Sequence, residues 1–202
     1  MSASTAEREP RPRGSGNSKA LLLSAATVEF AEFGLAGARI DRIAERAGVN
    51  KRLIYVYYGD KDRLFDAVVD DQARMMISAV PLTDGDLAKF AATRFDYVLA
   101  NPQARRIAVW VAFERAEPSD AEVERYRDRL STVTAAQREG RLRDDIPAAD
   151  LFAIVLRMTE SWLSAPSALR VAAGEEKTSP ARLRQHRAAL IAAVRSVAQP
   201  QA

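Results

Sequence analysis

Residues 39–61 read RIDRIAERAGVNKRLIYVYYGDK, and this stretch decides the fold. Its first part repeats apolar residues at helical spacing from Ile40 to Ala47, while charged residues fill the other face. Gly48 follows at once, and glycine ends helices readily because it adopts left-handed dihedral angles. Asn50 then offers a side-chain oxygen that can accept a free backbone N–H where a second helix begins. We therefore expect two short helices joined by a tight turn, the helix-turn-helix pattern.

The second of these helices has two different faces when it is wound at about 100° per residue. Its outer arc carries cationic, aromatic and apolar residues, namely Lys51, Arg52, Tyr55 and Val56. Its inner arc holds Ile54, Tyr57 and Tyr58, with Leu53 at the margin. In helix-turn-helix motifs such an outer face enters the major groove of DNA. A solvated charged face is the alternative, and it explains Lys51 or Arg52 taken singly better than it explains the whole pattern.

The outer residues differ in what they can contact on DNA. A lysine or arginine can bond guanine O6 and N7, and an apolar side chain such as Val56 or Leu53 can touch a thymine methyl group. A tyrosine hydroxyl or a lysine at a helix terminus more often meets phosphate, which sets the register without reading the sequence.

The segment IAERAGVNKRLIYVYYGDKDRLF resembles the DNA-binding segment of the TetR family of bacterial transcriptional regulators. The resemblance covers residues 18–69 and rests on the following elements: the Ile43-Ala44 pair, the Ala47-Gly48-Val49 turn, Tyr55, the Tyr57-Tyr58 pair and Lys61. It implies base contacts by Lys51, Arg52, Leu53 and Val56, and phosphate contacts by Tyr55, Tyr57 and Lys61. The DNA-binding residues that we predict are Arg39, Asn50, Lys51, Arg52, Leu53, Tyr55, Val56, Tyr57 and Lys61.

Four residues depart from the pattern of the family. The family often has a small residue at the position of Arg52 and a threonine or serine at that of Leu53. It commonly has hydroxyl residues before the first short helix, where this chain has Ala38 and Arg39. Arg39 could contact phosphate or be solvated. These departures leave the operator sequence unpredicted.

The flanking segments predict two longer helices. An apolar stripe from Leu22 to Phe33, interrupted by Glu29 and Glu32 and ended by Gly34, predicts a helix that supplies the core of the small domain. After Gly59, Asp60 can cap a long helix that ends before Pro81, and Lys61 lies in its first turn, beside backbone N–H groups that favour an anion.

Composition limits the remaining possibilities. The chain has 202 residues, a net charge of +3 and no cysteine, which excludes disulfides and thiolate zinc sites. No apolar run approaches the length of roughly 20 residues that spans a bilayer. The stretch ALLLSAATV after Lys19 could suggest a signal peptide, but the helical stripe continues through Glu29 and Glu32, so we interpret it as a helix. We expect a cytoplasmic protein with no membrane partner.

The first 17 residues are rich in Ser, Pro, Gly and Arg, and we predict a disordered tail there. Its arginines, Arg8, Arg11 and Arg13, could reach phosphates or a minor groove, although a solvated tail is the simpler interpretation. The domains that we predict are this tail at 1–17, a helix-turn-helix domain at 18–66, and a helical ligand-binding and dimerisation domain at 67–202.

Beyond Pro81 the pattern is helical throughout, with helices expected at 84–100, 103–116, 119–139, 150–164 and 179–198. By resemblance to the family, the last two long helices, 149–165 and 179–198, would pair with those of a second copy, so we predict a homodimer on a double-stranded DNA operator. The resemblance also implies a small-molecule effector, and the candidate pocket residues are Phe95, Trp110, Phe113, Met158 and Trp162. Ordinary core packing is the alternative role for each of them.

An enzyme is not expected. His186 is the single histidine, and no glycine-rich phosphate loop or Ser/His/Asp arrangement is present. A cluster of acids could suggest a cation site, but a solvated loop and helix start explains it better: Glu114, Glu117, Asp120, Glu122 and Glu124. We predict no cofactor and no metal. The predicted function is a sequence-specific transcriptional repressor released by a ligand; the alternatives are an activator, a regulator without a ligand, and a helical protein-interaction module.

Overall fold

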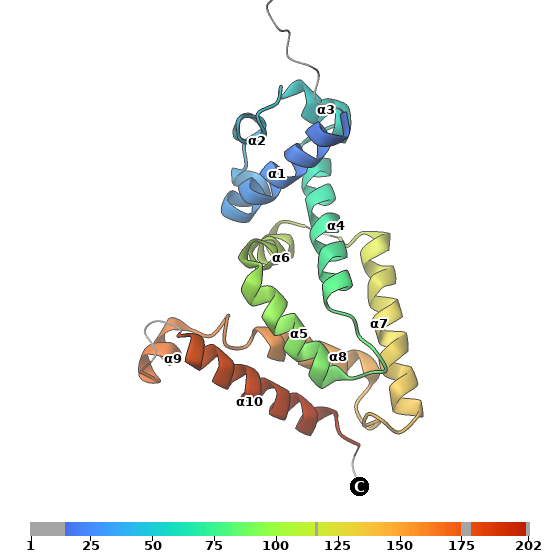
Figure 1. Ribbon diagram of the computed structural model, residues 1–202. Helices are drawn as coiled ribbons and strands as arrows, with labels where there is room; N and C mark the ends of the chain where they lie inside the picture. The colour runs from blue at the N-terminus through green and yellow to red at the C-terminus, as the bar shows by residue number, and fades with distance from the viewer. Residues whose placement is uncertain (1–14, 116, 175–178, 201–202) are drawn as a thin grey trace, which may run out of the picture. The chain divides into compact units, whose positions relative to one another are not determined.

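The computed structural model describes residues 15–115, 117–174 and 179–200, and every regular element in these ranges is an α-helix (Figure 1). The all-α fold predicted from the sequence is therefore confirmed. Two compact units divide the chain: unit 1 comprises the residues up to Val69 together with Arg106–Glu114, and unit 2 comprises Asp70–Arg105 and the residues from Arg115 onward. Most of the predicted N-terminal tail, with its three arginines, lies outside the described residues; residues 15–17 begin the first helix.

The division between the units falls inside two helices. Helix α4 (Lys61–Ala79) contributes its first half to unit 1 and its second half to unit 2. Most of α6 (Pro102–Glu114) belongs to unit 1, although the sequence analysis assigned this segment to the ligand-binding domain. The boundary that we predicted at residues 66 and 67 stays a prediction about function, because a compact unit need not coincide with a functional domain.

Unit 1 contains α1 (Ser15–Gly37), α2 (Ile40–Ala47), α3 (Arg52–Tyr58) and the parts of α4 and α6 named above. Its core joins α1 to α4, where the rings of Phe30 and Phe65 meet edge to face with centroids 5.0 Å apart. Fully buried aliphatic residues from each of the first four helices surround these rings, namely Leu22, Ile43, Ile54 and Leu64. Short helices such as α2 and α3 are marginal alone, so this packing is what stabilises them.

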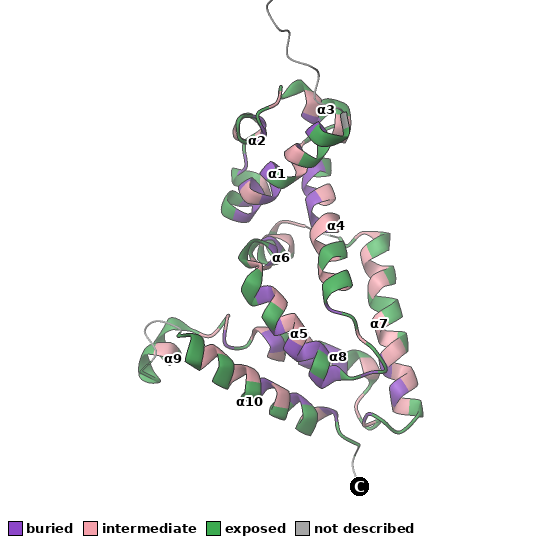
Figure 2. Ribbon diagram, in the orientation of Figure 1, coloured by how far each residue is buried: buried purple, intermediate pink, exposed green. Residues whose placement is uncertain are grey.

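Although no segment was expected to reach membrane-spanning length, helix α1 is long and apolar enough, by length and composition, to cross a membrane, and it is the only such helix in the described residues. Core helices pass the same test, and the inward residues of α1 form part of the unit 1 core, which Figure 2 shows in purple. We therefore interpret α1 as a core helix.

Unit 2 contains the second half of α4 together with α5 (Leu87–Ala100), α7 (Asp120–Arg138), α8 (Ala148–Glu160), α9 (Ser167–Ala172) and α10 (Pro180–Ala198). Three of these helices begin at polar residues whose side chains accept a backbone N–H three positions later, namely Asp86, Ser119 and Ser179. Helix α9 was not predicted, because its six residues are too few to show an apolar period.

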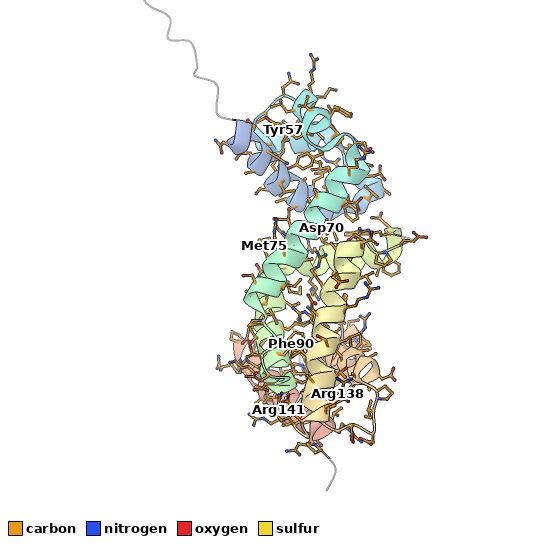
Figure 3. All side chains as sticks on the ribbon, turned by 90° about the vertical axis from the view of Figure 1, so that its right-hand side faces the viewer. Tyr57, Asp70, Met75, Phe90, Arg138 and Arg141 are labelled. Carbon is orange, nitrogen blue, oxygen red and sulfur yellow. The ribbon has the colours of Figure 1, made fainter. Side chains whose placement is uncertain are left out.

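The core of unit 2 lies where α5 packs against α8 and α10. The Phe90 and Phe152 rings lie 5.5 Å apart there, and Leu151, Leu190 and Val194 are also buried. In Figure 3, α7 runs beside the second half of α4. An ion pair between Arg125 of α7 and Asp70 of α4 joins these two helices.

Candidate DNA-binding site

The turn between α2 and α3 has the geometry that the sequence predicts. Gly48 adopts left-handed angles, with φ 65° and ψ 33°, and its N–H donates to the carbonyl groups of Ala44 and Glu45. A methyl group at Gly48 would meet no atom within 4 Å, so glycine is favoured there by its backbone angles and not by lack of space. Val49 is half-buried and packs against the core, which closes the angle between the two helices.

Asn50 organises the start of α3. Its side-chain Oδ1 accepts the N–H of Arg52 at 2.8 Å, which satisfies one of the free donors at the helix start. Helix α3 then runs for seven residues, from Arg52 to Tyr58. The side chain of Asn50 therefore stabilises the start of α3, the helix that we predict to contact bases.

The outer face of α3 is free in the described structure. Arg52, Tyr55 and Val56 are all exposed, and Val56 keeps 64% of its surface accessible, an unusual fraction for an apolar side chain in a folded domain. Leu53 is only half-exposed because it packs partly against the core of unit 1. The three exposed residues form a surface with a cation, a hydroxyl-bearing ring and a branched apolar group, which matches what base edges and phosphates offer.

Lys51 precedes α3 and pairs with Asp41 of α2, with Nζ and Oδ1 3.0 Å apart. The hydrogen bond that the ammonium donates to this carboxylate raises the pKa of Lys51, so the ammonium stays charged. Both side chains are largely exposed, and such pairs contribute little stability. DNA phosphates or base edges can therefore replace Asp41 as the partner of this cation.

The other predicted DNA-binding residues lie on α3 and on neighbouring segments of unit 1. Arg39 is exposed in front of α2, and Tyr57 is half-buried on α3 against the core. Lys61 is half-buried in the first turn of α4, with Nζ 3.4 Å from the carbonyl oxygen of Ala38. The side chain of Asp60 accepts the N–H of Arg63 at 2.8 Å, as its predicted capping role requires.

One residue that positions this site was missed in the sequence. Glu29 interrupts the apolar stripe of α1, yet its side chain is fully buried. Its Oε1 accepts the N–H of Arg39 at 2.9 Å and the Nε–H of Arg42 at 2.7 Å, so one carboxylate holds the entry to α2. The sequence does contain a signal for this role. Glu29 is an acid within an apolar stripe, and the arginines Arg39 and Arg42 follow shortly after the glycine that ends α1.

Comparison with known proteins agrees with this geometry. Residues 22–68 match the family model described as "Bacterial regulatory proteins, tetR family", and residues 86–196 match the one described as "Tetracyclin repressor-like, C-terminal domain". The second match alone covers more than half of the chain. The chain belongs to the TetR family. This confirms the family and the DNA-binding regulatory function that the sequence predicted.

Individual TetR relatives support the same assignment. The HTH-type transcriptional repressor SCO4008 of Streptomyces coelicolor is 38% identical over 160 residues, which are 77% of this chain and 83% of that protein. The HTH-type transcriptional regulator RutR of Escherichia coli is 32% identical over 104 residues, about half of either chain. The crystal structure of the transcriptional regulator SCO4942 from Streptomyces coelicolor superposes with a TM-score of 0.79, at 30% identity, over 90% of this chain and 98% of that one.

In this TetR-family chain, α6 is fastened to α1 inside unit 1. Gly34 interrupts α1 with φ 67°, and the next two N–H groups, those of Leu35 and Ala36, donate to the carboxylate of Glu114 at 2.6 and 3.2 Å. A methyl group at Gly34 would lie 2.8 Å from the Trp110 ring. Glu114 was expected in a solvated acidic cluster; the structure instead shows that it binds backbone donors.

The five predicted ligand-pocket residues do not share one environment. Trp110 and Phe113 belong to unit 1, where Trp110 packs on Gly34 and Phe113 is 81% exposed. In unit 2, Phe95 and Trp162 are buried, with His186 between their rings, and Met158 is half-buried against the core. Their role in binding a ligand stays a prediction. Among the described residues, no group of three or more His, Asp or Glu side chains could hold a metal ion.

Proposed function

We propose that this regulator is a homodimer that represses transcription by occupying an operator with two half-sites, and that a small molecule bound in unit 2 releases it. The observation that carries the DNA-binding part is the outer face of α3, where Arg52, Tyr55 and Val56 are exposed on a helix whose other face is buried in the core. A half-exposed Leu53 and the exposed Lys51 extend this face. Base contacts by Lys51, Arg52, Leu53 and Val56, with phosphate contacts by Tyr55, Tyr57 and Lys61, form part of the proposal.

Repression is supported by the relatives. SCO4008, which matches over most of its length, is named a repressor, and so is Rv3405c of Mycobacterium tuberculosis, which is 37% identical over 98 residues. A repressor needs no surface for recruiting polymerase. Occupation of the operator is enough, so the exposed face of α3 is sufficient for this role.

A dimer is supported by the outward face of α8 and α10. On α10 small residues follow each other at helical spacing on the exposed side, namely Ala181, Ala188, Ala189, Ala192 and Ser196. On α8 the apolar Ile154 is 42% exposed. Small side chains let two helices approach closely, and a twofold protein dimer matches an operator with two symmetric half-sites.

The test is binding of the full chain to the DNA upstream of its own gene and of neighbouring genes. A gel shift that survives an excess of unrelated DNA, followed by footprinting of two half-sites about 10 base pairs apart or a multiple of that spacing, would support the proposal. Absence of a shift at low salt, where phosphate contacts are strongest, would contradict it. Transcription from the bound promoter in vitro should then fall as protein is added; a rise would show an activator.

The cellular setting follows from these partners. DNA is the proposed macromolecular partner, and no membrane contact is part of the proposal. We therefore place the regulator in the cytoplasm, where bacterial operators lie.

A further inference from the structure

Unit 2 contains a small pocket formed by α4, α5, α7 and α8, with a cavity volume of about 90 Å³ and a side that is open to solvent. The residues that line it are Ala73, Met76, Ile77, Arg94, Glu122, Arg125, Tyr126, Arg129 and Leu156. None of the five residues predicted from the sequence is among them.

The walls of this pocket differ in chemistry. Helices α4 and α8 contribute only apolar side chains, which are Ala73, Met76, Ile77 and Leu156. Helices α5 and α7 contribute three arginines, a tyrosine and a single carboxylate, which are Arg94, Arg125, Arg129, Tyr126 and Glu122. A molecule that fills the pocket therefore meets hydrocarbon on one side and mostly positive charge on the other.

Two of the three guanidinium groups already have acidic partners. Arg94 Nη2 lies 2.5 Å from Glu160 Oε1, and Arg125 Nη2 lies 3.3 Å from Asp70 Oδ1. The one carboxylate of the lining, Glu122, lies 3.0 Å from Arg115 Nη1 and also accepts the N–H of Ser119 in the capping box of α7. These acids are occupied, so they do not neutralise the third arginine.

Arg129 is that third arginine. Its Nη2 donates to the carbonyl oxygen of Val80 at 3.2 Å, and its guanidinium lies 5.1 Å from the centre of the Phe90 ring, which Figure 3 labels. Within the described ranges it forms no ion pair with a carboxylate. Burial lowers the pKa of Arg129, which reflects the cost of removing an unpaired cation from water. An anion in the pocket would supply the missing partner.

We propose that this pocket binds an organic anion that carries a carboxylate on an apolar body, with Arg129 as the direct partner of the carboxylate and α4 and α8 covering the body. This inference rests on the proposed ligand response and names the chemical class of its effector. Helix α4 connects the pocket with the DNA-binding site. It lines the pocket from Ala73 to Ile77, and its first turn carries Lys61, a proposed phosphate contact.

The ligand class can be tested on the full-length protein without DNA. Octanoate, octylamine and 1-octanol each carry an eight-carbon chain, and their head groups are anionic, cationic and neutral. 1-Naphthoate and 1-naphthylmethylamine compare an anionic with a cationic head group on an aromatic body. Calorimetric titration should show binding of at least one carboxylate, with the matching amine weaker by about tenfold or more, and for octanoate the alcohol weaker as well. Failure of both carboxylates to bind, or equal binding of an amine or the alcohol, would overturn the proposal.

The site can be tested with a matched pair of variants on α7. Arg129→Gln should weaken carboxylate binding by about tenfold. Arg127→Gln should leave it unchanged, because Arg127 is exposed on the same helix and pairs with Glu124. If Arg129→Gln fails to fold by circular dichroism, Ala73→Leu fills the pocket from its apolar wall and should abolish binding. Unchanged carboxylate affinity in the folded variant would overturn the proposal.

The two proposals fail in different measurements. Operator binding is measured with no carboxylate present, and carboxylate binding is measured with no DNA present. Carboxylate binding without operator binding would support the pocket and contradict the proposed function. Carboxylate binding that leaves operator affinity unchanged would support the pocket and contradict only the ligand response, because an effector must bind the two states unequally.

Discussion

At the scale of single residues, the proposed roles of Arg52 on α3 and Lys61 on α4 differ, since Arg52 would contact a base and Lys61 a phosphate. Arg52 is exposed at the first turn of α3 and bonds no carboxylate in the described structure, so its guanidinium is free to meet a base. Lys61 lies at the start of α4 against the carbonyl oxygen of Ala38, a position suited to a phosphate. Substitutions at these two residues should therefore have different effects on different DNA sequences.

Arg52→Ala should lower operator affinity by about 1–3 kcal/mol and relax the preference at one base pair, if the guanidinium bonds a guanine. Lys61→Ala should lower the affinity for operator DNA and for unrelated DNA to a similar degree. Fluorescence anisotropy with both DNAs measures this, with Arg138→Ala as the control, since Arg138 is an exposed arginine of unit 2 at the C-terminal end of α7 (Figure 3). Equal losses on both DNAs for both variants would refute the division of roles.

Glu29 illustrates a residue that acts through its neighbours. Glu29→Gln removes the buried charge that faces Arg42 and weakens the acceptor of the Arg39 N–H. Because breaking one side of a buried ion pair is costly, we expect a loss of about 2–4 kcal/mol in the stability of the domain. Glu32→Gln, on the exposed face of the same helix, should change the melting temperature little. Similar melting temperatures for both variants would show that Glu29 is not structurally important.

His186 predicts a pH dependence of stability. It lies between Phe95 and Trp162, and burial, followed by the charge of Arg182, lowers its pKa. The unfolded chain therefore binds the proton more tightly than the folded chain does. The stability that comes from burying the neutral imidazole is fully present above the unfolded pKa of about 6.5, and it is lost as the pH falls through the lower folded pKa. Thermal unfolding from pH 8 to pH 5 should show the loss, and His186→Gln should reduce it. The same pH dependence in this variant would assign it to other groups.

At the scale of helices, the break in α1 at Gly34 creates a binding site for α6. The φ of 67° turns two N–H groups outward, and the Glu114 carboxylate occupies them while Trp110 covers the glycine. Helix α6 is thus joined to the DNA-binding unit by hydrogen bonds as well as by apolar packing.

Glu114→Ala should destabilise unit 1 by about 1–3 kcal/mol, because it leaves backbone donors of α1 without their charged acceptor. Glu117→Ala serves as the control, since Glu117 is exposed just beyond α6. Hydrogen exchange of the amides of Leu35 and Ala36, followed by mass spectrometry, should accelerate in the first variant alone. Unchanged exchange would show that the carboxylate does not protect these amides.

At the scale of the whole molecule, the proposed function requires two copies of the chain. Exposed alanines lie along α10, among them Ala188, Ala189 and Ala192, and a long charged side chain at Ala192 would keep a second copy from approaching this part of the helix.

Ala192→Arg should therefore shift the mass measured by light scattering from twice 22.2 kDa toward that of one chain, and operator affinity should fall with it. Ala121→Arg places the same side chain at an exposed alanine of α7 and should leave the dimer intact. A dimer that persists in Ala192→Arg would place the interface elsewhere, and a monomeric parent protein at micromolar concentration would refute the dimer itself.

Local patterns in the sequence determined the helix-turn-helix, the all-α class and the family. The helix-turn-helix depends on residues that are close together in the sequence. They are a glycine between two short amphipathic helices, an asparagine at the start of the second helix, and the two different faces of α3. Such features can be recognised without knowing the fold. The helices at 84–100 and 179–198 were predicted for the same reason, and they appear as α5 and α10.

Only the tertiary structure decided which charged residues are solvated and where a pocket lies. Glu29 and Glu114 look like surface acids in the sequence, and their partners lie 10 to 79 residues away. The pocket combines α4, α5, α7 and α8, and Arg129 lacks an acid there only because the nearby carboxylates bind other groups. Helical periodicity predicts which residues share a face, whereas partners from distant segments and the space between helices follow from how the helices pack.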